Sequence, residues 1–171
     1  MDTILREVTT EEVRILLEQL GTNAEQVKED LFHLEFPNGL RGHLITYGEP
    51  HVSSLQLRAG FSGFQRVEPR HLLNWDRRYR FSKSYLDADN DPVIESDLRL
   101  EGVTPEAIQA FIRDFGDQLT LFFLLFAHDR CQPGGVKVCK NQPTQKPYAP
   151  PSSRRLSKTR PTVSKPPRSA S

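Results

Sequence analysis

The chain is poor in the residue types that most often define a functional site. Of its 171 residues, two are cysteine, one is methionine and one is tryptophan. Cys131 and Cys139 are too few to build a disulfide framework, and their spacing fits no common zinc pattern, which would need four ligands. We therefore expect a reducing compartment and predict a cytoplasmic protein without a bound metal.

Long apolar segments are also missing. The longest apolar run covers residues 119–127 and is interrupted by Thr120, whereas a membrane-spanning helix needs about 20 apolar residues. The N-terminal region carries four acidic side chains by Glu12 and has no apolar stretch typical of a secretory signal. We expect neither a membrane span nor a signal peptide.

No catalytic motif is present either. The sequence contains no Gly-x-Ser-x-Gly elbow, phosphate-binding loop or dinucleotide fingerprint, and its five histidines form no His-x-x-x-His pair. Glu95 and Asp97 could form a carboxylate pair, although acids on an exposed strand more often face Arg or Lys on the next strand. We predict that the protein is not an enzyme and needs no cofactor. A hydrolase built from scattered acids and histidines is a remote alternative.

Acidic side chains are absent from the C-terminal end, which divides the charge of the chain. Residues 132–171 contain nine Lys or Arg, no Asp or Glu, and eight of the 13 prolines. The first 131 residues hold the other 14 basic side chains and all 22 acidic ones, for a net charge of −8. The C-terminal segment has too few apolar residues to offset an ordering entropy of about 1–2 kcal/mol per residue. We predict a folded domain at residues 1–130 and a disordered basic, Pro- and Ser-rich tail at residues 131–171.

The folded part opens with a helix and a strand meander. Thr9 and Glu12 fit a capping box, and apolar residues at helical spacing follow them, which predicts a helix over residues 10–20. The polar residues 22–30 are expected to connect this helix to the strands, with at most one further helical turn. Turn signals such as Asn38-Gly39 then separate three predicted strands at residues 31–36, 40–47 and 52–59.

Residues 72–101 hold the only Trp and two of the four Tyr, and the rest of the predicted fold is organised around them. Glu68-Pro69 opens a second helix, and alternation from Phe81 and again from Val93 predicts a β-hairpin. A third helix follows Thr104, with an apolar stripe at helical spacing made of Ile108, Phe111, Ile112, Phe115, Leu119, Phe122, Phe123 and Phe126. The predicted fold class is α+β, in the order α-β-β-β-α-β-β-α, with a twisted antiparallel five-stranded sheet packed with helices.

Two groups of potential metal ligands have simpler structural interpretations. Asp87, Asp89 and Asp91 are spaced like the start of a calcium loop, but the expected glycine and glutamate of such a loop are replaced by Pro92 and Leu98. We therefore predict a hairpin turn, with weak cation affinity as the alternative. His33 and His43 lie on adjacent predicted strands and could face each other, either as a metal pair or as ordinary strand residues.

Five short motifs occur in order along the chain: Asn74-Trp75-Asp76, Arg80-Phe81, Tyr85-Leu86-Asp87, Glu95-Ser96-Asp97-Leu98 and Gly102-Val103-Thr104. This ordered set resembles the YbjN family, which is described as "putative bacterial sensory transduction regulator". The resemblance covers roughly residues 9–127, although the first motif is compressed and Asn90 stands where a turn glycine is common. It implies a fold like that of the type III secretion chaperones and a regulatory role in bacteria. It also implies binding of a partner or client protein on a sheet or helix surface, often by a homodimer.

The partner-binding residues that we predict are aromatic. Phe122, Phe123 and Phe126, with the leucines between them, make the end of the third helix apolar nearly all round, which indicates burial on several sides or cover by a partner. We predict a dimer interface or client groove there, with Trp75 and Tyr79 as further contacts. Trp75, Tyr79 and the aromatic residues up to Tyr85 are also interleaved with cations, namely Arg77, Arg78, Arg80 and Lys83. Such a pattern could instead stack single-stranded nucleic acid. The net charge of −8 on the first 131 residues opposes this alternative.

The tail supports the alternative function, an adaptor for an anionic partner or nucleic acid. Its cations, among them Arg154, Arg155, Lys158 and Arg160, could bind a polyanion with strong salt dependence. They could equally lie on the acidic body or only keep the protein in solution. Ser157 follows two arginines and is a candidate phosphorylation site, where a phosphate would partly neutralise this charge.

Overall fold

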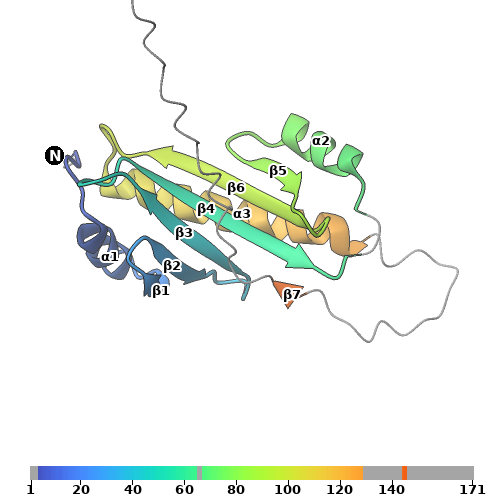
Figure 1. The fold of residues 1–171 in the computed structure, drawn as a ribbon, viewed down its shortest axis with the longest axis horizontal. Helices are drawn as coiled ribbons and strands as arrows, with labels where there is room; N and C mark the ends of the chain where they lie inside the picture. Colours follow the sequence, from blue (N-terminus) through green and yellow to red (C-terminus); the bar gives the residue numbers. More distant parts are fainter. Residues whose placement is uncertain (1–3, 65–66, 129–143, 146–171) are drawn as a thin grey trace, which may run out of the picture.

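The structure is a computed structural model, and it describes residues 4–64, 67–128 and 144–145. The described parts hold three α-helices and seven strands (Figure 1). In chain order these are α1 (Thr10–Gln19), β1 (Asn23–Lys28), β2 (Leu31–Glu35), β3 (Arg41–Tyr47), β4 (Ser54–Ser62), α2 (Pro69–Arg78), β5 (Lys83–Leu86), β6 (Pro92–Arg99), α3 (Pro105–His128) and β7 (Thr144–Gln145). None of these helices is long and apolar enough to cross a membrane.

Six strands form one antiparallel sheet in the order β1-β2-β3-β4-β6-β5. The α+β class is confirmed, but the prediction of five strands is wrong, because β1 occupies the segment that was expected to be a connection. β1 is an edge strand, and along it only Ala24 is partly covered. A strand exposed on both faces has no alternation of apolar residues, so its sequence carries no strand signal. Its charged side chains protect the open edge from pairing with other chains.

The remaining strand, β7, consists of Thr144 and Gln145, which belong to the predicted tail. They pair antiparallel with Ser62 and Phe61 at the end of β4, which extends beyond its pairing with β3 and β6. These two residues are therefore paired with the sheet, while the domain boundary near residue 130 stays a prediction.

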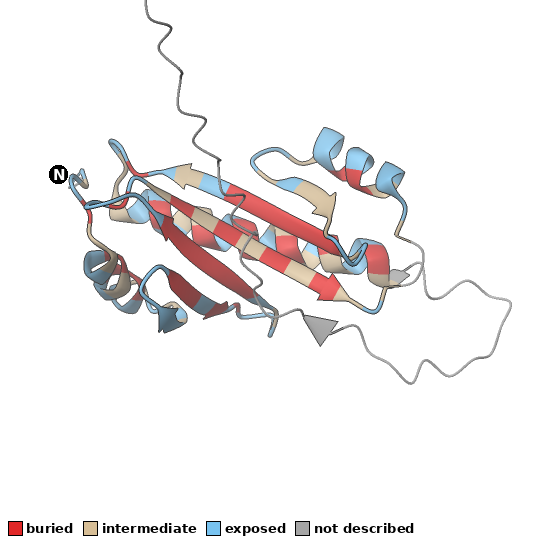
Figure 2. Cartoon of the chain, viewed as in Figure 1, coloured by how far each residue is buried: buried red, intermediate tan, exposed pale blue. Residues whose placement is uncertain are grey.

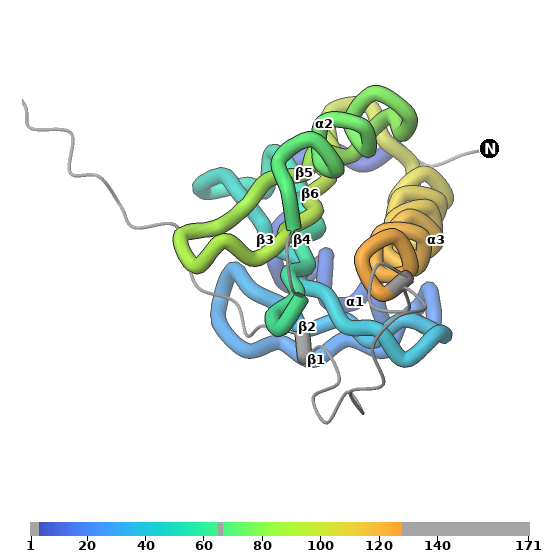
Figure 3. The backbone as a smooth tube through the Cα atoms, turned by 90° about the vertical axis from the view of Figure 1, so that its right-hand side faces the viewer, coloured from blue at the N-terminus to red at the C-terminus, as the bar shows by residue number. Residues whose placement is uncertain are grey.

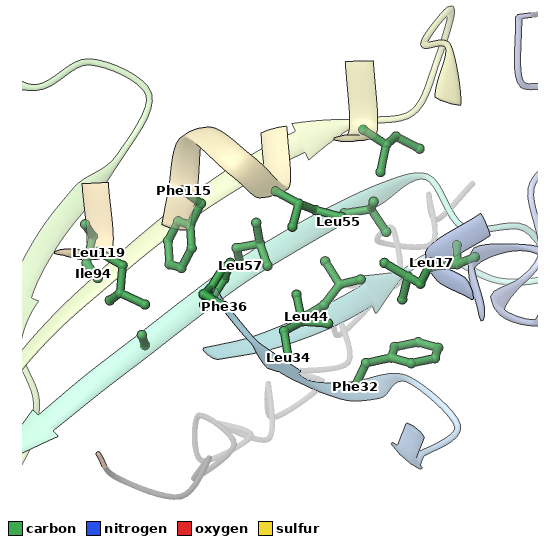
Figure 4. Packing of buried hydrophobic residues seen from close by; sticks show 14 of the residues in the cluster. Leu17, Phe32, Leu34, Phe36, Leu44, Leu55, Leu57, Ile94, Phe115 and Leu119 are labelled. Carbon is green, nitrogen blue, oxygen red and sulfur yellow. The ribbon is translucent and has the colours of Figure 1, made fainter. Parts of the chain in front are cut away.

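The core lies between the sheet and α3. Figure 3 shows the sheet curving around α3, with α1 near β1 and α2 near β5 on the same side. Residues of β4 alternate between buried and partly covered along the strand (Figure 2). The buried set, which includes Leu57 and Ile94 of the sheet, packs against Phe115 and Leu119 of α3 (Figure 4). The apolar stripe predicted for the third helix is therefore the face that covers the sheet.

A glycine in α3 permits its close approach to the sheet. A Cβ atom at Gly116 would lie 2.7 Å from Cδ1 of Phe36, whose ring is buried and packs against Phe115 at 6.0 Å between centroids. The turn that follows Phe36 is also tied to α3, because the Asn38 side-chain amide donates to the hydroxyl of Thr120. The helix and the β2–β3 hairpin therefore meet at this point without room for an additional methyl group.

The predicted hairpin forms, but its first strand starts later than expected. β5 begins at Lys83, and Phe81 lies in the loop after α2 with φ at +67° and 85% of its surface exposed. The hydroxyl of Ser96 donates a hydrogen bond to the Phe81 carbonyl. Phe81 is therefore a loop residue and not a member of the alternating strand, which corrects the prediction.

Candidate partner-binding surface

Three of the aromatic residues predicted to contact a partner lie in the core. Trp75, Phe122 and Phe126 are 2%, 0% and 4% exposed. The Phe122 ring packs edge-on against Trp75 at 5.0 Å and against Phe126 at 4.9 Å between centroids. In this structure they offer almost no surface to a partner, so their burial does not support the predicted contact. Their role is to join α2 to α3.

The other two predicted aromatics are partly buried at the margin of this core. Tyr79 stacks on Trp75 with centroids 3.9 Å apart, and Phe123 packs against Phe61 at 5.4 Å. Each presents one part of its ring to the surface and the rest to the core. Contact with a partner through Tyr79 and Phe123 stays a prediction.

The outward side of the same helix carries apolar residues that face solvent. Leu121, Leu124 and Leu125 are 45%, 53% and 43% exposed, and their spacing of three and four places them on one side of α3. We call these three residues the α3 leucine patch. The sequence shows that the helix end is apolar nearly all round, but our prediction assigned the partner contact to the phenylalanines and not to these leucines. The larger side chains face the core, and periodicity does not show which of two apolar sides is covered.

On the face of the sheet away from α3, polar side chains converge on Glu95 of β6. Arg58 of β4 lies 3.4 Å from the Glu95 carboxylate and Lys83 of β5 lies 3.2 Å from it, while the Tyr85 hydroxyl donates a hydrogen bond to it. Only 8% of the Glu95 side chain is exposed. The buried carboxylate therefore has two cations and a hydroxyl as partners, which is what a charge on a partly covered surface requires.

The same network continues to Asp97. Lys83 bridges the two acids, with its ammonium 3.2 Å from Asp97, and Gln56 donates to Asp97 at 2.8 Å. Burial acts to lower the pKa of Lys83, but its hydrogen bonds to Asp97 and Glu95 dominate and raise it. Burial and the bond to Glu95 raise the pKa of Tyr85 as well. Glu95 and Asp97, the two acids considered as a catalytic pair, are thus both ion-paired with Lys83. In this network the pKa values of the two donors Lys83 and Tyr85 are raised.

The two strand histidines do face each other. His33 and His43 are directly opposite in the β2–β3 register, and their rings meet edge to face at 4.8 Å between centroids. Burial lowers the pKa of His43 to about 4, and the neighbouring His33 adds to this effect. In the described ranges no group of three or more His, Cys, Asp or Glu side chains is arranged to hold a metal ion. The pair is compatible with packing between two strands.

The acidic segment between β5 and β6 forms the predicted turn. The Asp87 carboxylate accepts hydrogen bonds from the backbone N–H groups of Asp89 at 2.9 Å and Asp91 at 3.0 Å, and Asn90 adopts a positive φ of 62°. Asp and Asn favour such turns because their side chains bond the local backbone and tolerate this conformation.

Comparison with known proteins gives a match to one family model and to solved structures. The YbjN family model, described as "Putative bacterial sensory transduction regulator", matches residues 9–127. The chain belongs to the YbjN family. A crystal structure of YbjN from E. coli, titled a "putative transcription regulator", is 18% identical, with a TM-score of 0.53 over 76% of this chain and 96% of that one. No curated protein matches the chain.

A second solved structure is the Yersinia pestis type III secretion chaperone SycH in complex with a stable fragment of YscM2. It is 16% identical, with a TM-score of 0.49 over 66% of this chain and 98% of SycH.

Several residues of the YbjN motifs hold the fold together. Trp75 is in the core, and the carboxylate of Asp76 accepts hydrogen bonds from the backbone N–H and the hydroxyl of Ser84, both at 2.9 Å. This contact covers the open edge of β5 with α2. Gly102 takes a positive φ of 74° just before α3. The motifs thus identify the family through its architecture, and they do not overlap the α3 leucine patch.

The YbjN match ends before the predicted tail. The tail cations Arg154, Arg155, Lys158 and Arg160 and the candidate phosphorylation site Ser157 lie outside the described residues. Their roles stay predictions.

Proposed function

We propose that this YbjN-family protein is a non-catalytic module that binds a partner protein, and that the α3 leucine patch is the contact surface. One observation carries the proposal: Leu121, Leu124 and Leu125 are exposed side by side on a helix whose opposite side is fully engaged in the core. Exposed apolar side chains that cluster on one helix face are typical of protein interaction sites. Burying such leucines is favourable by about 25 cal/mol per Å² of apolar area.

The residues that precede the patch indicate the chemistry of the partner. Asp114 and Asp117 are exposed and lie on the same side of α3, two turns and one turn before Leu121. Arg113 is 3.7 Å from Asp114 and offsets one of these charges, so the side chains that precede the leucine patch keep a net negative charge. We infer that the partner is an amphipathic helix of another protein, with an apolar stripe for the leucines and basic residues for the acidic end.

The polar network on the opposite face supports a non-catalytic role. Its central carboxylate, Glu95, is held by Arg58, Lys83 and Tyr85. Burial and the hydrogen bond to Glu95 raise the pKa of Tyr85, and the contacts of Lys83 with Asp97 and Glu95 raise its pKa against the opposing effect of burial. A general acid or base needs a pKa near the working pH. This arrangement fits a rigid support for the sheet better than it fits proton transfer.

A photo-crosslinking experiment tests the contact surface. A photoreactive amino acid is placed at Leu124 of the full chain, in cells that naturally produce the protein. It should form an adduct with another protein, and the double substitution Leu121→Gln with Leu125→Gln should abolish this adduct. The matched control places the same probe at Leu73, which is 60% exposed on α2.

The cross-linked peptide should be an amphipathic helix with basic residues beside its apolar stripe. An adduct with a second copy of this chain would instead make the patch a homodimer interface. The absence of any adduct specific to Leu124, with the fold intact by circular dichroism, would contradict the proposal.

A further inference from the structure

A second surface, at the end of α2 and the loop before β5, combines an exposed aromatic ring with positive charge. We propose that Phe81 and the three arginines that precede it, Arg77, Arg78 and Arg80, form a docking point for an acidic protein segment that carries an apolar side chain. This docking point lies beyond the proposed function and on a different part of the molecule. His71, near the start of α2, packs on Phe126 of α3, whereas the loop follows the other end of α2 (Figure 1), about 10 Å further along the helix at about 1.5 Å per residue.

The conformation of Phe81 is unfavourable in two respects. The side chain is 85% exposed, although an aromatic ring gains more than most side chains from burial. Its φ of +67° is uncommon for any residue with a Cβ and an outlier for a bulky one. Such conformations persist where the surroundings impose them, and they concentrate at sites that bind ligands.

Hydrogen bonds at Phe81 and at the residues that follow it hold the loop in place. The Ser96 hydroxyl donates to the Phe81 carbonyl, and the indole N–H of Trp75 donates to the Ser82 hydroxyl at 3.2 Å. Asp76 anchors Ser84 through the two contacts at 2.9 Å. The ring is therefore presented by a preformed loop, so a partner would meet little cost in ordering it.

The charge of this loop is unusual for the folded domain. Arg77, Arg78 and Arg80 lie within four residues of one another, and across the described ranges no carboxylate is within ion-pair distance of them. Arg78 lies over the Tyr79 ring at 5.7 Å. Lys83, by contrast, is held by Glu95 and Asp97. Three such guanidinium groups within four residues of an exposed ring fit carboxylates that flank an apolar side chain.

Charge and geometry favour this occupant over two others. The basic tail of the chain has nine cations and no acids, so the arginines repel it. Single-stranded nucleic acid needs several aromatic faces for successive bases. Trp75 is buried, Tyr79 is stacked on it, and the first 131 residues carry a net charge of −8. An acidic protein segment requires only one ring and the local positive charge.

A subtractive peptide selection tests the proposal on the full chain. Peptides from a random display library are selected on the wild-type protein after removal of those that bind Phe81→Gly, which has the same tail. Glycine adopts positive φ without strain, so this variant should keep its fold. The selected peptides should be rich in Asp and Glu around one apolar residue.

Their affinities are then measured for the wild-type protein and four variants. Kd should rise at least about tenfold for Phe81→Gly and for the triple variant Arg77→Gln, Arg78→Gln, Arg80→Gln, and it should rise with salt. Two control variants should leave Kd unchanged: Leu73→Ala, an exposed leucine on the same helix, and Arg113→Gln, an exposed arginine elsewhere.

The proposal is overturned if no peptide survives the subtraction, if the surviving peptides lack acidic residues, or if they bind the triple variant normally. It is also overturned if these variants lose binding of labelled oligodeoxythymidylate but not of peptides, which would make the loop a nucleic-acid surface. Substitution of Leu121 and Leu125 should not affect the peptides, so failure here is separate from failure of the proposed function.

Discussion

Glu95 is the acidic side chain of the sheet with the most polar contacts. It is nearly buried, and Arg58, Lys83 and Tyr85 all bind it. Asp97, two residues further along β6, shares Lys83 but has a side chain that is 53% exposed. The two acids therefore share one cation but differ in their other partners and in their access to water.

Because of this difference, we expect neutralisation of Glu95 and of Asp97 to lower the free energy of unfolding by unequal amounts. Glu95→Gln should lower the free energy of unfolding by about 2–3 kcal/mol, because it removes the charge of a buried carboxylate that binds the mostly buried Arg58 at 3.4 Å. Asp97→Asn should cost less than about 1 kcal/mol, because exposed ion pairs contribute little. Urea unfolding of both variants measures the difference, and equal losses would contradict the structural interpretation of the network.

The lowered pKa of His43 leads us to expect that stability depends on pH. Burial, with the nearby His33, lowers its pKa from 6.5 to about 4, so between these values the unfolded chain binds a proton that the folded chain excludes. Stability should therefore fall as pH decreases from about 6.5 to 4, with this residue contributing at most about 3 kcal/mol. Unfolding of His43→Gln should show a weaker fall than wild type over this range. The exposed His51→Gln is the control, and an unchanged slope in His43→Gln would contradict the prediction.

At the scale of elements, the contact of α3 with the β2–β3 hairpin depends on Gly116. In an open helix, Gly→Ala would raise stability by about 1 kcal/mol. Here the new methyl group would meet the Phe36 ring, so Gly116→Ala should instead lower the free energy of unfolding by about 1–3 kcal/mol.

The double variant Gly116→Ala with Phe36→Leu provides the control, because the smaller side chain makes room for the methyl group. It should lose less stability than the sum of the two single variants. Additive losses in thermal unfolding would show that the Phe36 ring is not the obstacle.

At the scale of the whole molecule, the near-neutral total charge hides two oppositely charged parts. The first 131 residues carry −8 and the following forty carry +9. Only Thr144 and Gln145 of the second part are described, at the end of β4. Charge of this kind acts over distances set by the salt concentration, about 10 Å at 0.1 M.

The charge division predicts how truncation changes polyanion binding. The full chain should be retained on heparin with a steep dependence on salt, and a chain ending at residue 130 should not be retained. Thermal unfolding should change little, since the cut removes only the two paired residues of β7 from the described structure. Retention that survives the cut would assign polyanion binding to the folded domain, with the arginines before Phe81 as the first candidates.

Local sequence signals predicted most of the elements correctly. The capping box forms as expected, with the Thr9 N–H donating to Glu12 at 2.7 Å and the Glu12 N–H donating to Thr9 at 3.2 Å. The alternation in β4 and the stripe of α3 also correspond to buried faces. These features depend on neighbours within a few residues, so they are visible without the rest of the chain.

The sequence alone established the α+β class, the family and the division into an acidic and a basic part, because composition and short motifs carry this information. The tertiary structure decided three other points. It made residues 23–28 an edge strand through backbone pairing that leaves no side-chain pattern. It placed Phe115, Phe122 and Phe126 of α3 inside and three leucines outside, and it turned Phe81 outward in its loop. Each of these depends on which surfaces meet across the fold, and such contacts join residues far apart in sequence.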